Sequence, residues 1–176
     1  MSERGIKAPV LKELQRQLNH ELGAAHSYLA LALWCDLQNL KGFARYFSKQ
    51  AHEERAHAQK FIGHLLDRNV LPLLTAVAAP TTDFQGLLEI ARHAQKMEQA
   101  NTAGIHACYA AATAANDYAA QVLLHWFINE QVEEEDWADE MVERVESANC
   151  SGGLSDLDRH IERYLEGEGA NAAPAS

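Results

Sequence analysis

Apolar residues recur every three or four positions along most of this chain, and prolines and glycines are scarce in the same stretches. This period is typical of helices that bury one face. Five helices are predicted, four long and one short: residues 9–39, 42–69, 82–116, 117–148 and 155–165. Pro9 suits a first helical turn, while Thr82-Asp83 and Ser155 suit N-terminal caps. The fold class is therefore predicted to be all-α.

The lengths of the connections predict how the helices are arranged. The first and second helices, and the third and fourth, are joined by short links, so the members of each pair are expected to be antiparallel neighbours. The link between the second and third helices, "NVLPLLTAVAAPTTD", is long enough to run the length of a bundle. These lengths predict a four-helix bundle with one long crossover and a short fifth C-terminal helix.

One domain is expected over residues 9–166, after an N-terminal extension of residues 1–8. The end of the chain, "EGEGANAAPAS", is rich in glycine, alanine and polar residues. Such a composition favours disorder, so residues 167–176 are predicted to form a disordered tail.

The predicted buried face of each long helix carries a carboxylate near its middle. The residues concerned are Glu21 on the first helix, Glu54 with His57 on the second, Glu98 on the third and Glu134 on the fourth. One such glutamate can turn to the surface or pair with an arginine. Four of them exceed the basic residues available on the facing stripes, and burying unpaired carboxylates is prohibitive. Bound cations solve this problem. This set of ligands suits iron or manganese, and zinc could bind there opportunistically.

The stretch "KQAHEERAHAQ" holds a histidine pair that looks at first like a zinc-protease signature. That signature needs histidines four residues apart on one helix face. His52 and His57 are five apart, about 140° around a helix of 3.6 residues per turn, so they cannot grip one metal ion. Glu54 and His57 are three apart and share a face, which is the Glu-x-x-His arrangement of di-iron bundles.

With these pieces in place, the chain resembles the ferritins, in particular the bacterial haem-free type, over residues 9–165. The matching pieces are "NHELGAAHSYLALALWC", "FSKQAHEERAHAQKF", "KMEQ" and "LLHWFINEQVEEE". The resemblance implies a ferritin-like bundle that assembles into a hollow homo-24-mer. It also implies ferroxidase activity, in which Fe(II) is oxidised by O2 or H2O2 and a ferric mineral is stored inside the shell.

The resemblance also implies the iron ligands. Those of the first iron are Glu21, Glu54 and His57. Glu54 would bridge to a second iron held by Glu98 and Glu134, with Gln131 beside it. Glu98 is counted with the catalytic residues, as is Tyr28, which lies one inner turn from Glu21 and matches a tyrosine next to the iron pair. A plain core role for Tyr28 stays open.

Bacterial ferritins of this type often have a third, more exposed iron site. The residues that match its pattern are Glu53, Glu130, Glu133 and Glu134. For the first three of these residues an acidic, solvated helix face is an equally good interpretation.

Departures from related families narrow the resemblance. Bacterioferritins and rubrerythrins have a second Glu-x-x-His on the fourth helix, where this chain reads "QVEE" over residues 131–134. The second iron site is therefore expected to be poorer in nitrogen. Arg55 stands where a bacterioferritin uses a haem-binding methionine, so no haem is expected.

The overall charge points to the same class of ligand. A net charge of −10 disfavours nucleic-acid and anionic-membrane partners, which need clustered lysine and arginine, and favours cations. Cys35, Cys108 and Cys150 have no metal-like spacing and are predicted to be reduced thiols. No secretory leader and no membrane-length apolar run is found, so a soluble, cytoplasmic protein is expected.

Two other functions stay open at this stage. The same bundle could serve a di-iron peroxidase or oxidase that stores no iron, or a helical interaction protein whose inner carboxylates are incidental. The fifth helix favours the shell, because a closed four-helix enzyme does not require it. Asp117, at the link between the third and fourth helices, is a candidate for lining a pore.

Overall fold

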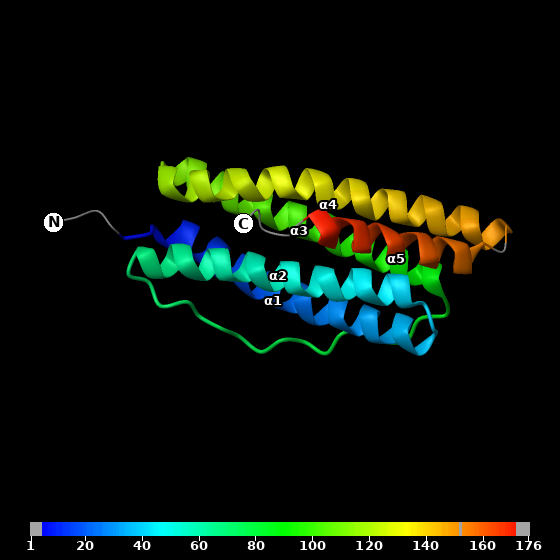
Figure 1. Ribbon diagram of the computed structural model, residues 1–176. Coiled ribbons are helices and arrows are strands. Elements are labelled where there is room, and N and C mark those ends of the chain that lie inside the picture. Colours follow the sequence, from blue (N-terminus) through cyan, green and yellow to red (C-terminus); the bar gives the residue numbers. More distant parts are fainter. Residues whose placement is uncertain (1–4, 152, 172–176) are drawn as a thin grey trace.

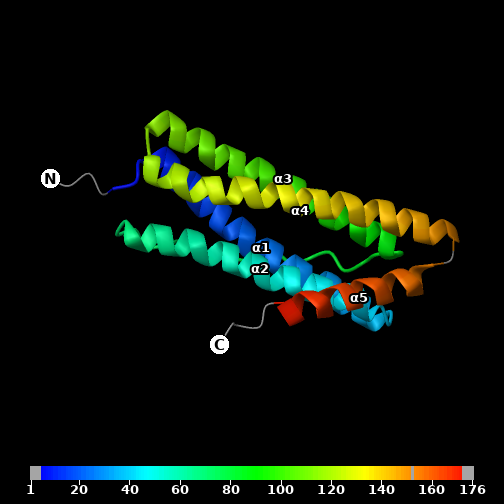
Figure 2. The same ribbon diagram turned by 45° about the horizontal axis from the view of Figure 1, so that its top comes forward.

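The computed structural model describes residues 5–151 and 153–171, which form five α-helices and no strand (Figure 1). Their bounds are α1 Ala8–Leu37, α2 Lys41–Asp67, α3 Leu87–Ala115, α4 Tyr118–Ser151 and α5 Leu154–Asn171. The first four helices form one elongated bundle, and α5 folds back against α2 and α4 (Figures 1 and 2). The all-α bundle with a short fifth helix, predicted from the sequence, is confirmed.

Three of the long helices end at asparagine. Asn39, Asn69 and Asn116 adopt the left-handed backbone conformation, with φ of 60°, 57° and 54°. Asparagine tolerates this conformation better than most residues, so it commonly stops a helix. The predicted ends of these helices are confirmed to within two residues.

Two helix bounds differ from the prediction by five residues or more, whereas the others differ by three at most. Helix α3 begins at Leu87 rather than at Thr82, because the Glu89 carboxylate accepts a hydrogen bond from the backbone N–H of Gln85, 2.8 Å away, just before the first turn. The cap-like pair Thr82-Asp83 therefore lies in the crossover. Helix α5 continues to Asn171, beyond the predicted end at residue 165, because each residue added to a formed helix gains one backbone hydrogen bond.

The predicted disordered tail is therefore wrong for residues 167–171, which are helical. Composition alone misjudged this segment, because it describes the unfolded preference of the residues and takes no account of the helix that precedes them. Residues 172–176 lie outside the part of the chain that the structure describes.

The crossover, residues 68–86, runs from one end of the bundle to the other (Figure 1). It therefore returns the chain to the end at which α2 began, as its length predicted. Asn19 of α1 ties it to the bundle. The Asn19 side chain donates to the carbonyl of Leu73 and accepts from the backbone N–H of Thr75, both at 2.8 Å.

The bundle interior has two apolar parts with a polar layer between them. One part is built around Phe43, Phe47 and Leu31, and the other around Phe61, Phe127 and Leu14. The buried polar side chains between the two parts are Gln17, Glu21, Gln50, Glu54, His57, Glu98, Asn101 and Gln131. Within the described ranges, no helix is long and apolar enough to cross a membrane.

The two cysteine side chains that the structure describes form no disulfide. Cys35 and Cys108 are buried and unpaired, and burial raises the pKa of each thiol to about 12. Both stay protonated at neutral pH and behave as small core residues. The prediction of reduced thiols is confirmed for these two, while the side chain of Cys150 lies outside the described residues.

Helix α5 is attached to the start of α2 by a close backbone contact. A Cβ atom added at Gly42 would lie 2.0 Å from the carbonyl oxygen of Asp158, so only glycine fits there. The Asp158 carboxylate accepts a 3.0 Å hydrogen bond from the backbone N–H of Phe43 and so caps α2 from another helix. Arg45 pairs with Glu162 at 3.2 Å one turn further along.

Substituting Gly42→Ala is expected to displace α5 and to lower the free energy of unfolding by about 1–3 kcal/mol, the usual range for overpacking. The added methyl group meets backbone atoms of α5, which cannot rotate away. Thermal unfolding followed by circular dichroism measures the loss. Gly63→Ala is the matched control on the same helix, since nothing lies within 4 Å of its added Cβ. An unchanged midpoint for Gly42→Ala would contradict this account of how α5 is anchored.

Candidate metal centre

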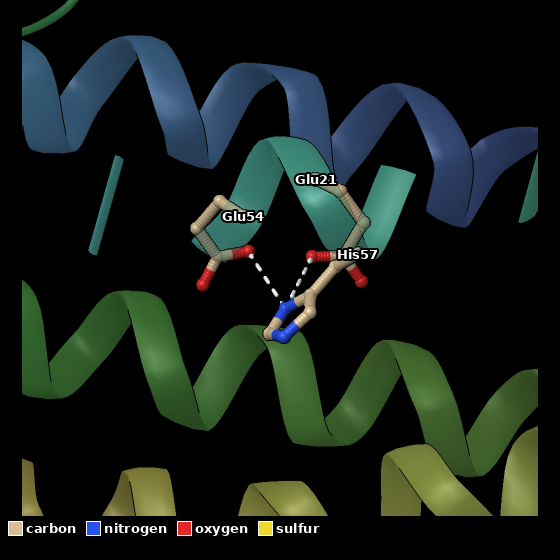
Figure 3. A group of neighbouring side chains, drawn as sticks. All are labelled: Glu21, Glu54 and His57. Carbon is tan, nitrogen blue, oxygen red and sulfur yellow. Dashed lines mark ion pairs between the residues drawn. The ribbon is translucent and has the colours of Figure 1, made fainter. Parts of the chain in front are cut away.

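Three side chains from two helices meet in the middle of the polar layer. Glu21 comes from α1, whereas Glu54 and His57 stand one turn apart on α2. Both carboxylates point to the same imidazole nitrogen, with Glu54 Oε2 at 3.5 Å and Glu21 Oε2 at 3.9 Å from His57 Nδ1 (Figure 3). Each residue has a ligand atom within 4.8 Å of those of the other two. No other such group of three occurs in the described part of the chain.

Two atoms of this group have no hydrogen-bond partner among the described residues. They are Glu54 Oε2 and His57 Nδ1, and both are fully shielded from solvent. A buried polar atom without a partner destabilises a fold by about 1–3 kcal/mol, and by more where it is charged. A cation between these atoms would satisfy both at once. The donor set, two carboxylates and one imidazole, fits a divalent first-row metal such as Fe(II).

The second predicted group is held apart from the first by hydrogen bonds of its own. Glu98 accepts a hydrogen bond from the Tyr28 hydroxyl and another from Gln131 Nε2, at 3.2 Å. Glu134, half-buried on α4, accepts from Gln50 Nε2 at 2.7 Å. The structure therefore brings these side chains to the same layer but leaves Glu98 and Glu134 bound to neighbours rather than to the first three residues.

The family follows from comparison with known proteins. A family model described as a ferritin-like domain matches residues 11–148. The chain belongs to the ferritin family.

Individual relatives agree. A bacterial non-heme ferritin from Staphylococcus aureus (strain USA300) is 41% identical over 126 residues, which cover 72% of this chain and 76% of the relative. One from Staphylococcus saprophyticus is 41% identical over 133 residues, covering 74% and 78%. The crystal structure of an open pore ferritin from the hyperthermophilic archaeon Archaeoglobus fulgidus matches with a TM-score of 0.86 and 31% identity, over 89% of this chain and 96% of that one. Membership of this family supports iron storage as the function and iron as the metal.

The residues predicted for a third iron site line one pocket of this ferritin. Glu53, Glu130, Glu133 and Glu134 surround a cavity of about 160 Å³ between α2 and α4. The last described side chain of α5, Leu165, forms part of its wall. Lys49 pairs loosely with Glu53, at 3.7 Å. The pocket is half open to solvent, in contrast to the sealed group of Glu21, Glu54 and His57.

Burial favours the protonated form of the inner carboxyl groups. Removal from water, followed by the nearby carboxylates, raises the pKa of Glu54 to about 8 and that of Glu134 to about 7. The pKa of Glu21 is raised well above its usual range, mainly by burial and by the hydrogen bond that it shares with Glu54. Burial also raises the pKa of Glu98. Metal ions must therefore displace protons from this site when they bind.

The helix geometry predicted from the sequence placed His52 correctly, away from the site. His52 is exposed, with its Nδ1 2.6 Å from the Ser48 carbonyl oxygen, so it takes no part in the site. The ring of His57 instead packs edge-on against Trp126 and Phe127, at centroid distances of 5.4 Å and 5.7 Å, which fixes its direction.

Sequence reasoning gave a role to Gln131 but to none of the other three amides of this ferritin's site. Gln17, Gln50 and Asn101 are buried and donate hydrogen bonds to its carboxylates. Their positions in the sequence could have identified them. Gln17 stands four residues before Glu21 on the same helix face, and Gln50 and Asn101 interrupt apolar stripes.

Asp117, the pore candidate, is already engaged. Its carboxylate accepts two hydrogen bonds from Arg68, at 2.7 Å and 2.8 Å, and one from the backbone N–H of Ala120 at 3.1 Å. It caps α4 and ties that helix to the end of α2. Burial acts in the opposite direction, but these bonds hold the pKa of Asp117 below its usual value. The structure thus gives it a structural role, and its part in a pore stays a prediction.

Proposed function

We propose that this ferritin is a cytoplasmic ferroxidase and iron store, which oxidises Fe(II) with O2 or H2O2 at a di-iron centre inside the bundle. The ferric product is deposited as mineral inside a shell of 24 subunits. The observation that carries the proposal is the pair of buried atoms without partners, Glu54 Oε2 and His57 Nδ1, which face each other beside Glu21.

The substrate ions are assigned to the residues as follows. The first Fe(II) is held by Glu21, Glu54 and His57, whose ligand atoms already converge. Burial first, and then the carboxylates of Glu98 and Glu134, raise the pKa of Glu54, which supports a place for it between the two groups. It is therefore the residue that would bridge to a second Fe(II), held by Glu98 and Glu134 with Gln131 beside it.

Two ions side by side make a two-electron reaction accessible. Each Fe(II) loses one electron, and O2 takes up both electrons and two protons to give H2O2. With H2O2 as the oxidant, two electrons and two protons give two molecules of water. The carboxylate-rich ligand set favours Fe(III) over Fe(II) and so drives the oxidation. Burial and Glu98 raise the pKa of Tyr28, so its hydroxyl keeps its proton and can donate it to Glu98 as a hydrogen bond.

The acidic pocket of Glu53, Glu130, Glu133 and Glu134 supplies a way out of the centre. Glu134 belongs both to the proposed second iron site and to this pocket, so an ion can pass from the second site to the half-open pocket without leaving carboxylate ligands. Ligands that are partly solvated bind less tightly, which favours release toward the mineral. These four residues are proposed as the third iron site.

Assembly is supported by an apolar patch that the subunit leaves exposed. Leu29, Leu33 and Leu37 lie on the outer face of α1, with exposed fractions of 41%, 64% and 79%. Together with Trp34 and Pro80 they line a hollow whose surface is almost wholly apolar. A second copy of the chain could cover this hollow and the exposed leucines beside it, and a second copy is therefore the expected partner.

The particle and its iron test the proposal together. Purified protein is expected to have a native mass near 24 times the 19.5 kDa subunit and to keep oxidised iron in solution with the protein. Leu33→Glu, which places a charge in the apolar patch, is expected to give smaller particles that still oxidise the first ions but let the excess precipitate. Native mass spectrometry and iron analysis of size-exclusion fractions measure both properties.

The same experiment separates this proposal from a di-iron peroxidase or oxidase on the same bundle. Such an enzyme would consume the oxidant but leave no iron in the protein fraction. A wild-type dimer that holds two irons per chain at most would refute storage and favour that alternative.

A further inference from the structure

Two buried amides hold the Glu21 carboxylate from both sides. Gln17 Nε2 donates to Glu21 Oε1 at 2.9 Å, and Asn101 Nδ2 donates to Glu21 Oε2 at 3.3 Å. The amides are also linked to each other, because Gln17 Nε2 donates to Asn101 Oδ1 at 2.5 Å. Both side chains are essentially sealed from solvent. Glu21 is thus fixed before any metal arrives, whereas Glu54 Oε2 has no hydrogen-bond partner.

We propose that Gln17 is a positioning residue for the first metal ion, acting through Glu21. This inference rests on the proposed function of the site. With both oxygens of Glu21 accepting amide hydrogen bonds, the carboxylate keeps one orientation, and each oxygen still has a lone pair for a metal. An ion that binds then meets Glu21 already in place.

The direction of the Gln17 amide supports this assignment. Its carbonyl oxygen, Oε1, is buried without a hydrogen-bond partner among the described residues. The opposite orientation would set that oxygen against the Glu21 carboxylate, with two acceptors facing each other. The amide therefore donates its N–H to the Glu21 carboxylate while its own carbonyl oxygen is left without a hydrogen bond. This favours a role in the site over a role in packing.

A glycine on the facing helix makes room for this amide. A Cβ atom added at Gly104 would lie 2.1 Å from Gln17 Oε1. The side chain of Gln17 thus fills the space that any other residue at position 104 would need. Arg16 donates to the Gly104 carbonyl at 3.0 Å and holds α1 and α3 in register at this point.

The hydrogen bonds of these amides extend to the second group of ligands as well. Asn101 Nδ2 also donates to Gln131 Oε1 at 3.3 Å, and Gln131 Nε2 donates to Glu98 Oε2 at 3.2 Å. A continuous series of amides therefore joins Glu21 to Glu98 across three helices. Loss of Gln17 removes one of the two amides that hold Glu21 and leaves the ligands themselves intact.

Two substitutions test the inference without touching a ligand. Gln17→Met keeps the size of the side chain but removes the donor, and Gly104→Ala pushes the amide aside. We expect each to weaken the first Co(II) binding step about tenfold, since partners of metal ligands typically contribute 10- to 100-fold. Gly63→Ala, with open space around its added Cβ, is the control and should bind as the wild type does.

The measurements are an anaerobic Co(II) titration followed by the visible absorption of the bound ion, and initial rates of oxidation over a range of Fe(II) concentrations. The KM for Fe(II) is expected to rise while kcat is retained, because the saturated site is unchanged. Thermal unfolding should show a loss of stability in both variants, because each takes the Gln17 donor away from buried oxygens of Glu21 and Asn101. Gly42→Ala, which is expected to lose stability away from the site, should bind Co(II) as the wild type does. Weaker binding confined to the Gln17 and Gly104 variants is not what a general loss of stability would give.

The inference is wrong if Gln17→Met binds Co(II) as tightly as the wild type, or if only Gly104→Ala is impaired. A kcat that falls with an unchanged KM would also overturn it. Failure of the proposed function looks different, because the wild-type protein itself would then bind no Co(II) at the site and show no rapid oxidation.

Discussion

Glu54→Ala is expected to abolish the rapid phase of Fe(II) oxidation, a decrease of at least about 100-fold, because even partners of metal ligands typically contribute 10- to 100-fold. Glu54 meets His57 and Glu21 in the first group, and the carboxylates of Glu98 and Glu134 contribute to its raised pKa. Its removal would separate the two ions as well as remove a ligand from each. Stopped-flow absorbance after mixing Fe(II) with aerated apoprotein measures the rate.

His57→Ala should give a loss of the same order, since it removes the nitrogen ligand of the first ion. The matched control is His52→Ala, five residues earlier on the same helix, where the imidazole is exposed and lies outside the site. The control should oxidise iron at the wild-type rate. If Glu54→Ala and His57→Ala both keep the rapid phase, iron is oxidised elsewhere and the site is wrongly assigned.

The metal-free protein should become less stable as the pH rises from about 5 to about 8. In the unfolded chain Glu54 and Glu134 ionise near their ordinary value of 4.5, whereas in the folded protein the pKa values are about 8 and about 7. Between these limits the folded state binds protons that the unfolded state has released. The stabilisation is complete below pH 4.5 and is lost as the pH rises through the folded-state pKa values.

For Glu54 the loss is on the order of 3 kcal/mol, or roughly 6–12 °C in the unfolding midpoint of a chain of this size. Glu54→Gln has no charge to bury, so the variant should be more stable than wild type at pH 8.5 and equal to it at pH 5. Exposed Glu143→Gln is the control and should follow the wild type at both values.

Thermal unfolding at low ionic strength, with and without Zn(II), measures these differences. Zn(II) should reverse the trend in the wild type, because a bound cation stabilises the ionised carboxylates and binds more tightly as protons leave. A metal-free protein whose midpoint rises steadily from pH 5 to pH 8 would show that the carboxyl groups are not protonated in the fold.

Much of the architecture could be predicted from local pattern alone. The spacing of apolar residues located all five helices, because one helix face repeats every 3.6 residues whatever lies opposite it. The same count separated His52 from His57, and the structure confirms that only His57 turns inward. Helix ends that depend on one residue, such as Asn69 in the left-handed conformation, were also located.

The two helix bounds that the sequence misplaced, the start of α3 and the end of α5, depend on side-chain contacts or on the cooperativity of helix formation. The start of α3 is set by a reach-back hydrogen bond from Gln85 to Glu89, and the end of α5 by the helix that precedes residue 167. The docking of α5 needs Gly42 to meet the backbone of Asp158, more than a hundred residues away. No local pattern encodes such a contact.

The sequence by itself determined which side chains face the interior, because the direction of a side chain on a helix depends only on its position along that helix. It therefore placed Glu21, Glu54, His57 and Glu98 in one buried layer. Only the tertiary structure decided which of these atoms find partners. Amides from α1 and α3 bind Glu21, and Tyr28 and Gln131 bind Glu98, whereas Glu54 Oε2 and His57 Nδ1 have no hydrogen-bond partner. The distances between helices follow from the packing of all four helices. These distances decide which buried carboxylate oxygens find a hydrogen-bond donor and which are left free to bind a metal ion.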